Sequence, residues 1–129
     1  MTRKATCCCG LCSIEVEGEP MINAICHCGN CKKRTGSAFG WSLYFPDAQV
    51  GKRTGDLKAY SIDGAKRQER WFCAACGTTL FWKVARIPNQ TGIAGGCFGE
   101  TPLAAPVATV FNDGRCRWLR LPEEWRTSL

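Results

Sequence analysis

Three cysteines within six residues form the motif most capable of chemistry in this sequence, Cys26-His27-Cys28-Gly29-Asn30-Cys31. One tight turn at this spacing can direct all three sulfurs toward a single point, an arrangement that suits a soft metal ion, with zinc as the default. The motif has no obvious fourth ligand nearby, and catalytic zinc sites typically keep three protein ligands and one open position. The spacing therefore predicts a reactive zinc site on Cys26, Cys28 and Cys31.

Two further cysteine pairs predict a second, structural zinc site. Each pair is followed by a glycine, which can take the positive φ that a metal-binding knuckle requires. Each pair also flanks a segment that alternates like a strand, the layout of a zinc ribbon that ties distant parts of a sheet together. The four expected ligands are Cys7, Cys9, Cys73 and Cys76. Cys8 should face away from its neighbours and act as a packing thiol.

The three-cysteine site has an alternative interpretation, in which the fold brings in a fourth ligand and closes it as a structural site. The candidates are His27, Cys12, Cys97 and Cys116, none of which has motif spacing. His27 should face away from the site because it lies between Cys26 and Cys28.

The ligand set narrows the chemistry of an open site. Three thiolates donate much negative charge to the ion, so its power to acidify water should be well below that of a three-histidine site. Hydrolysis is therefore disfavoured. The same site is well suited to hold a fourth thiolate, such as that of glutathione, as a nucleophile near neutral pH.

Basic residues follow the three-cysteine motif directly. In one interpretation they form a solvated face, and in the other they offset the thiolates and attract an anionic ligand, with Lys33 or Arg34 binding a carboxylate of glutathione. A rival function is a non-catalytic zinc module that binds a protein or nucleic acid. Its basic patch would comprise Lys32, Lys33, Arg34, Lys66, Arg67 and Arg70.

Length and composition indicate a single globular domain over residues 1–129, with 45% hydrophobic and 22% charged residues. The formal charge of +6 falls to about +3 once two thiolate-rich zinc sites are counted, which argues against a nucleic-acid partner. No apolar run approaches the roughly 18 residues of a membrane span, and the N-terminus lacks the apolar core of a signal peptide. We therefore expect a cytoplasmic protein, in which metal ligation explains the eleven cysteines better than disulfides do.

Short alternating segments and frequent turn residues predict a mainly β fold of short antiparallel strands with little helix. Strands are expected at 13–17, 39–45, 57–60, 79–84 and 107–111. A helical turn should follow the three-cysteine motif and end at Gly36, and Pro122 suggests a late helix through Trp125. Residues 51–55 should form a basic turn.

Three motifs in order give the sequence a resemblance to a known family: Cys7-Cys8-Cys9-Gly10, residues 26–36, and Phe72-Cys73-Ala74-Ala75-Cys76-Gly77. With these motifs the chain resembles, over nearly its whole length and including Pro102 to Phe111, the glutathione-dependent formaldehyde-activating enzymes, whose domain is shared with centromere protein V. The resemblance implies a zinc-binding β-tent fold. It implies a structural zinc on Cys7, Cys9, Cys73 and Cys76 and a second zinc on Cys26, Cys28 and Cys31. It also implies a carbon–sulfur lyase that condenses glutathione with formaldehyde, or a related small aldehyde, to S-hydroxymethylglutathione.

Overall fold

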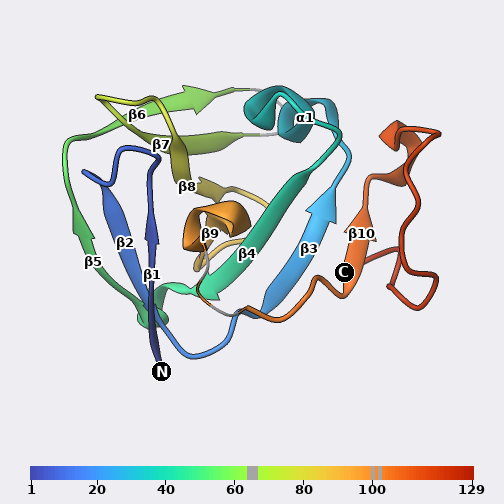
Figure 1. Cartoon of the computed structure of the whole chain (residues 1–129), viewed down its shortest axis with the longest axis horizontal. Coiled ribbons are helices and arrows are strands. Elements are labelled where there is room, and N and C mark those ends of the chain that lie inside the picture. Colours follow the sequence, from blue (N-terminus) through green and yellow to red (C-terminus); the bar gives the residue numbers. More distant parts are fainter. Residues whose placement is uncertain (64–66, 100, 102) are drawn as a thin grey trace.

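The computed structural model describes residues 1–63, 67–99, 101 and 103–129 and contains two β-sheets (Figure 1). The smaller sheet has the order β1 (Thr2–Thr6), β2 (Ser13–Glu17) and β5 (Val50–Thr54). The larger sheet has the order β10 (Ala108–Val110), β3 (Ile22–Cys26), β4 (Gly40–Pro46), β9 (Gln90–Ala94), β8 (Thr79–Val84), β7 (Gln68–Cys73) and β6 (Leu57–Ile62). The expected mainly β fold of short strands is confirmed, and β10 pairs with β3 in parallel while the other neighbouring strands are antiparallel.

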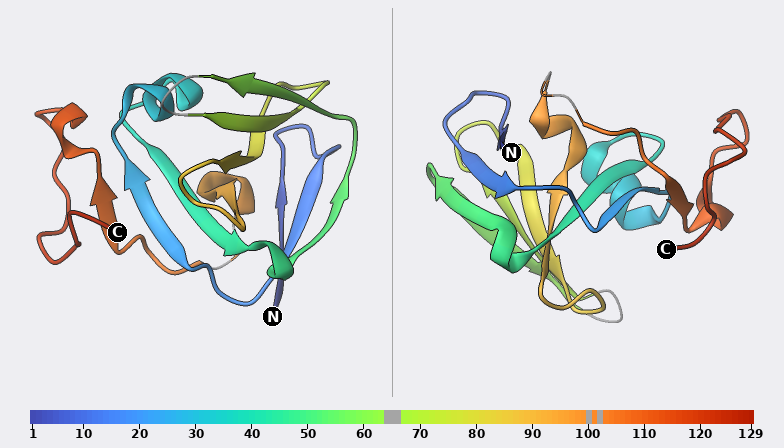
Figure 2. Two further views of the ribbon diagram at one scale, coloured as in Figure 1. Left: turned by 180° about the vertical axis from the view of Figure 1, so that it is seen from behind. Right: turned by 90° about the horizontal axis from the view of Figure 1, so that it is seen from below.

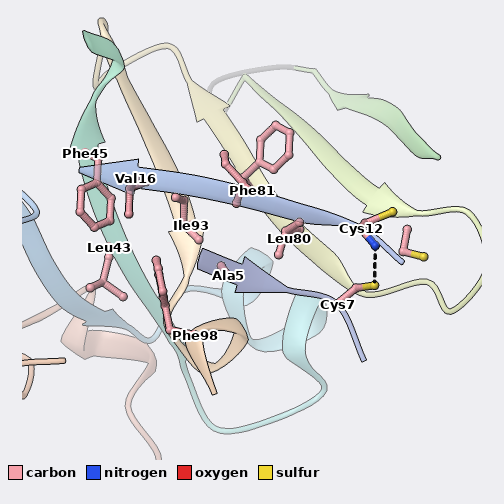
Figure 3. Packing of buried hydrophobic residues seen from close by; sticks show 12 residues of the cluster. Ala5, Cys7, Cys12, Val16, Leu43, Phe45, Leu80, Phe81, Ile93 and Phe98 are labelled. Atoms are coloured by element: carbon pink, nitrogen blue, oxygen red, sulfur yellow. Dashed lines mark hydrogen bonds between the residues drawn. The ribbon is translucent and has the colours of Figure 1, made fainter. Parts of the chain in front are cut away.

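One face of the larger sheet packs against the smaller sheet and forms the main core (Figure 3). Leu43, Phe45 and Ile93 from the larger sheet are completely buried there. Ile14 and Val16 of β2 pack against them and expose at most 1% of their surface. Because successive side chains of a strand point to opposite faces, the alternate residues of β4 and β8 must lie on the other face. That second face carries the candidate functional site.

A row of paired residues crosses the second face of the larger sheet. Ile22 of β3 lies opposite Tyr44 of β4, Tyr44 lies opposite Gly92 of β9, and Gly92 lies opposite Trp82 of β8. A Cβ atom at Gly92 would collide with the Trp82 indole ring, so glycine lets this ring lie flat across β9. The row therefore forms a largely apolar surface on this face of the sheet, with the aromatic side chains of Tyr44 and Trp82.

Helix α1 (Gly29–Thr35) connects β3 to β4 at the end of the larger sheet (Figure 1). Cys28 is its N-cap residue, and the Cys28 sulfur accepts a hydrogen bond from the Cys31 amide at 3.4 Å. Gly36 ends the helix with a φ of 63°, as the sequence predicts. The short helix thus holds two of the three clustered cysteines in one turn.

Within the described residues, the connections also contain three 3₁₀ helices: η1 (Asp47–Gln49), η2 (Gly95–Phe98) and η3 (Asn112–Gly114). The segment after β10 lies at the side of the molecule, away from β5 and β6 (Figure 2). No helix in the part of the chain that the structure describes is long and apolar enough to cross a membrane.

Two sequence predictions about local structure are wrong. Residues 51–55 do not form a simple turn, because most of them belong to β5, which pairs with β2 so that Arg53 lies opposite Ile14. Pro122 starts a single turn rather than a helix. The Trp125 amide donates a hydrogen bond to the Pro122 carbonyl at 3.3 Å and closes this turn. Arg126 then pairs with Ala108, so the chain must be extended there.

Candidate functional site

The first cysteine cluster joins the two sheets. Cys7 and Cys9 lie in the connection between β1 and β2, whereas Cys73 is the last residue of β7 and Cys76 lies in the turn that leads to β8. Their four sulfur atoms all lie within 4.8 Å of one another, and the Cys9 sulfur is 3.7 Å from that of Cys73. Four thiols at this spacing could hold a metal ion, as the sequence predicts.

The two turns of this first cluster have the same knuckle geometry. Gly10 and Gly77 both have a φ of 80°. In each turn a backbone amide donates to a cysteine sulfur, from Cys12 to Cys7 at 3.3 Å (Figure 3) and from Cys76 to Cys73 at 3.4 Å. These bonds stabilise negative charge on the sulfurs, which suits metal ligation. Because its ligands come from segments of both sheets, a metal ion here would tie the sheets together.

The second cysteine cluster lies at the end of β3 and the start of α1. The sulfurs of Cys26, Cys28 and Cys31 lie within 4.8 Å of one another, with Cys26 buried and the other two half-buried. Among the described residues, no other histidine, cysteine, aspartate or glutamate completes this group. The second cluster could therefore hold a metal ion through three thiolates and leave a position for another ligand.

The four candidates for a fourth ligand all lie outside the second cluster. His27 is fully buried, and its Nε2 lies 2.7 Å from the Thr109 hydroxyl. That hydroxyl donates to Asn112 Oδ1 at 2.7 Å, so His27 carries its proton on Nε2 and faces β10. Cys12 lies beside the first cluster, Cys97 belongs to η2, and Cys116 lies in the segment after β10.

The prediction that Cys8 is a buried packing thiol is wrong. Its sulfur does not join the first cluster, but the residue is exposed rather than buried as a packing thiol. The reason is that Cys8 lies in the turn after β1 rather than in an extended segment, and its amide donates to the Thr78 hydroxyl at 3.1 Å.

A cavity of about 100 Å³ lies beside the second cluster, on the second face of the larger sheet. The three clustered cysteines form one wall, and alternate residues of β3, β4 and β8 form the floor, including Ser42, Tyr44 and Trp82. Three arginines also line it, which are Arg34, Arg67 and Arg86. The cavity therefore combines potential metal ligands with positive charge.

Arg34 lies between the second cluster and the cavity floor. Its guanidinium group lies 3.8 Å from the centre of the Trp82 ring, a cation–π contact. A Cβ atom at Gly40 would lie only 2.5 Å from Arg34 Nη2 and 3.1 Å from Cys31 Cβ. The glycine therefore leaves room for the Arg34 side chain in this position. Lys33, its neighbour on α1, is exposed and is not among the residues that line the cavity.

Two arginines near the second cluster, Arg34 and Arg70, form no ion pair with any described residue. Arg70 is buried and donates to Gln68 Oε1 at 3.1 Å and to the Tyr60 hydroxyl at 3.2 Å. No carboxylate of the described residues lies within ion-pair distance of Arg34 or Arg70. A hydrogen bond from Cys26, followed by the charge of Arg34, lowers the pKa of Cys31 to about 6, and the same shared proton raises that of Cys26. A thiolate is therefore favoured in the cluster at neutral pH.

The predicted basic patch does not form one exposed surface. Arg70 is buried, Arg34 lies in the cavity, and Lys32 donates to the Gly114 carbonyl. Lys66, another predicted member, lies outside the described residues. Sequence reasoning missed Ser42, Tyr44 and Trp82, although the alternation within 39–45 could have placed the first two on one face. Nothing in the sequence pattern indicates Arg86.

The comparison with protein families agrees with this geometry. The model of the family named "Glutathione-dependent formaldehyde-activating enzyme" matches residues 2–114. The chain belongs to this family. The matched residues include both cysteine clusters.

One solved structure shows the same fold. A crystal structure of a Rhodobacter sphaeroides protein is similar over 77% of this chain and 90% of its own, with 22% sequence identity and a TM-score of 0.62. At this identity the similarity supports the fold alone. No functionally curated protein matches the chain at a significant level.

Proposed function

We propose that the protein is a zinc-dependent carbon–sulfur lyase that condenses glutathione with formaldehyde, or a related small aldehyde, to S-hydroxymethylglutathione. The observation that carries the proposal is a three-thiol cluster without a fourth protein ligand among the described residues, which opens on an arginine-lined cavity. Residues 1–129 would act as one domain, in the cytoplasm, where reducing conditions keep the clustered thiols available.

The residues present fit two zinc ions. Sulfur ligands at this spacing favour zinc over hard cations, and four thiols at the first cluster match a closed structural site. Cys26, Cys28 and Cys31 would hold the second ion. Zinc bound there supplies a binding position for the glutathione sulfur and keeps that sulfur deprotonated.

The arginines of the cavity would bind and orient glutathione. This tripeptide carries two carboxylates, and a guanidinium group can bind a carboxylate through two parallel hydrogen bonds. Arg34 lies nearest the clustered thiols, whereas Arg67 and Arg86 are exposed and can contact the outer parts of the substrate. Lys33 remains a second candidate at the edge, and the structure favours Arg34 of this pair because Arg34 lines the cavity.

The size of the cavity favours a small aldehyde. An engineered protein cavity of ~150 Å³ accommodates benzene. A cavity of about 100 Å³ therefore has room for a thiol and an aldehyde of one or two carbons, while the rest of glutathione lies toward solvent. The apolar floor, with Ile22 and Val84, limits the access of water to the reacting groups.

The reaction balances without an added oxidant or reductant. The glutathione sulfur donates an electron pair to the carbonyl carbon, and a carbon–sulfur bond forms as the carbonyl π bond breaks. The electron pair of that π bond moves to the oxygen, which takes up a proton and becomes the hydroxyl of the adduct.

Exchange NMR of glutathione and formaldehyde at equilibrium tests the proposal. The zinc-loaded protein should accelerate interconversion of free glutathione and adduct, and Cys28→Ser should return the rate to background. A fully zinc-loaded protein that gives no acceleration would overturn the proposed activity.

A further inference from the structure

We propose that the Tyr44 hydroxyl donates a hydrogen bond to the carbonyl oxygen of the bound aldehyde and stabilises the negative charge that develops there. This makes Tyr44 a catalytic residue, and the inference rests on the proposed function. It assigns the part of the reaction that neither the cysteines nor the arginines explain, which is the treatment of the aldehyde oxygen.

Tyr44 lies where such a contact requires it. It is on β4, only 8% of its surface is exposed, and its side chain lines the cavity together with Cys26 and Cys31. The register of the sheet places Cys26 opposite Gly40 and Ile22 opposite Tyr44, so no bulky side chain of β4 stands opposite the cysteine. Because the clustered thiols and the phenol line the same cavity, an aldehyde bound there can contact both.

A hydrogen bond fixes the direction of the Tyr44 hydroxyl. Trp82 Nε1 donates to the Tyr44 oxygen at 3.0 Å, and an indole N–H can only donate. The phenol oxygen is thus the acceptor in this bond, and its own O–H remains able to donate. No described residue accepts a hydrogen bond from it. A buried donor without a protein acceptor is costly, which makes the cavity the natural place for its acceptor.

Trp82 is itself held in place from two sides. Its ring lies against Gly92, and the Arg34 guanidinium covers its face at 3.8 Å. Trp82 acts as a positioning residue, because its role in the reaction is to orient the Tyr44 oxygen through this hydrogen bond. The donor is therefore oriented before the aldehyde binds, which is what stabilisation of a developing oxyanion requires.

The charge environment keeps Tyr44 in the form that can donate. Burial raises the pKa of the Tyr44 hydroxyl above its ordinary value of 10.0, so the phenol keeps its proton at neutral pH. In the reaction the carbon–sulfur bond forms while the carbonyl electron pair moves to the oxygen. Tyr44 donates to this oxygen, and a proton from solvent completes the hydroxyl.

The first test uses the two tyrosines of the chain as a matched pair. Tyr44→Phe keeps the ring and removes the hydroxyl, whereas Tyr60→Phe makes the same change on β6 at a residue that is 41% exposed and lies outside the cavity lining. In exchange NMR, Tyr44→Phe should reduce the acceleration about tenfold or more. Tyr60→Phe removes one of the two acceptors of Arg70 and leaves the Gln68 acceptor in place, so its effect should be much smaller. Zinc content, far-UV circular dichroism and glutathione affinity should stay the same in both variants.

A second readout compares two ligands of the same shape. S-hydroxymethylglutathione and S-ethylglutathione differ in one hydroxyl group in place of a methyl group. The unmodified protein should bind the hydroxymethyl compound several-fold more tightly, and Tyr44→Phe should abolish that preference while its affinity for S-ethylglutathione is kept. A merely structural role for Tyr44 would weaken both ligands equally.

The outcomes separate this inference from the proposed function. If the unmodified protein accelerates exchange and Tyr44→Phe is as fast as Tyr60→Phe, Tyr44 is excluded while the lyase activity stands. If instead Ser42→Ala removes the preference for the hydroxymethyl compound and Tyr44→Phe does not, Ser42 on the same strand is the donor and the inference is overturned. If the unmodified protein gives no acceleration, the proposed function itself has failed.

Discussion

The two cysteine clusters use the same kind of ligand but differ in what surrounds them. The first cluster draws its thiols from two segments that belong to different sheets, and its four sulfurs could hold a metal ion without a further ligand. The second cluster draws three thiols from one short segment, and beside them lies a cavity with arginines and a tyrosine. In our proposal, the number of ligands and the neighbouring surface therefore decide which cluster is structural and which binds substrate, because both clusters offer the same type of ligand.

The two clusters also differ in the groups that stabilise their thiolates. At the first cluster, a hydrogen bond from the Thr78 hydroxyl lowers the pKa of Cys76 to about 5, so local hydrogen bonds supply the stabilisation of the thiolate. At the second cluster, the charges of Arg34 and Arg70 add to the hydrogen bond from Cys26. Positive charge that is not neutralised by carboxylates can also bind an anionic substrate.

The largest expected effect concerns the first cluster. Cys73→Ser should unfold the protein or lower its stability severely, because a structural zinc contributes on the order of 10 kcal/mol of folding free energy in small zinc modules. Thermal melts and gel filtration measure this effect. Cys8→Ser, at an exposed neighbour outside the cluster, is the matched control and should melt normally. A Cys73→Ser protein that melts within a few degrees of the unmodified one would show that the first cluster does not hold the sheets together.

The second cluster should tolerate the corresponding change. Cys28→Ser should leave a folded protein with one zinc fewer, because Cys28 and its neighbours contact the cavity rather than join the two sheets. Elemental analysis should give two zinc ions per unmodified chain, one of which a mild chelator removes readily, since three thiolates hold an ion less firmly than four. A single inert zinc per chain, or a Cys28→Ser variant less stable than Cys73→Ser, would reverse the assignment of the two clusters.

A smaller effect distinguishes the two cations that follow Cys31. Arg34→Met should raise the KM for glutathione about tenfold or more, because it removes a half-buried guanidinium from the cavity. Lys33→Met removes an exposed charge from the same helix and should have a clearly smaller effect. The comparison is made by steady-state exchange rates at several glutathione concentrations. Equal effects would mean that general positive charge, rather than the cavity, attracts the substrate.

The smallest effect lies at the end of β8 that is farthest from the first cluster. The Asp47 carboxylate accepts from Lys83 Nζ at 2.6 Å and from the Thr91 hydroxyl at 2.7 Å, and the bond from Lys83 lowers its pKa below 3.8. A lowered pKa means that the ionised form stabilises the fold above the ordinary pKa and that this contribution disappears as the pH falls through the lowered value.

Asp47→Asn should therefore cost less than about 1 kcal/mol at pH 7, because the ion pair is partly exposed. The melting temperatures of the two proteins should differ by a constant amount from pH 7 to about 5, and the difference should begin to shrink as the pH falls below about 4. A difference that grows in acid would contradict this role for Asp47.

The cysteine spacing made the second cluster and each pair of the first cluster predictable, because ligands close in sequence lie close in space. The joining of the two distant pairs followed from the pattern they share, two cysteines followed by a glycine. Cys26, Cys28 and Cys31 lie within one turn, and the two glycine-terminated pairs share one knuckle geometry. The cavity could not be predicted in this way. It depends on which residues of β3, β4, β8 and β9 lie opposite one another, and that register follows from long-range pairing.

Local signals also failed where long-range pairing opposed them. Glycines at 51 and 55 indicated a turn, yet pairing with β2 makes this segment an edge strand. Pro122 favoured a helix start, but pairing of Arg126 with Ala108 keeps the chain extended beyond the first turn. The sequence placed Arg70 in an exposed basic patch, but the residue is buried. Its burial depends on the pairing of β7 with β8, which places Arg70 opposite Trp82 and which no local signal indicates.

Cadmium-113 NMR of the cadmium-substituted protein tests the central claim most directly, since it observes both clusters at once. We predict two resonances, of which glutathione shifts one and leaves the other unchanged, and Cys28→Ser should remove the resonance that responds. Two resonances that both ignore glutathione, or a response that survives in Cys28→Ser, would contradict the division into a structural and a substrate-binding cluster.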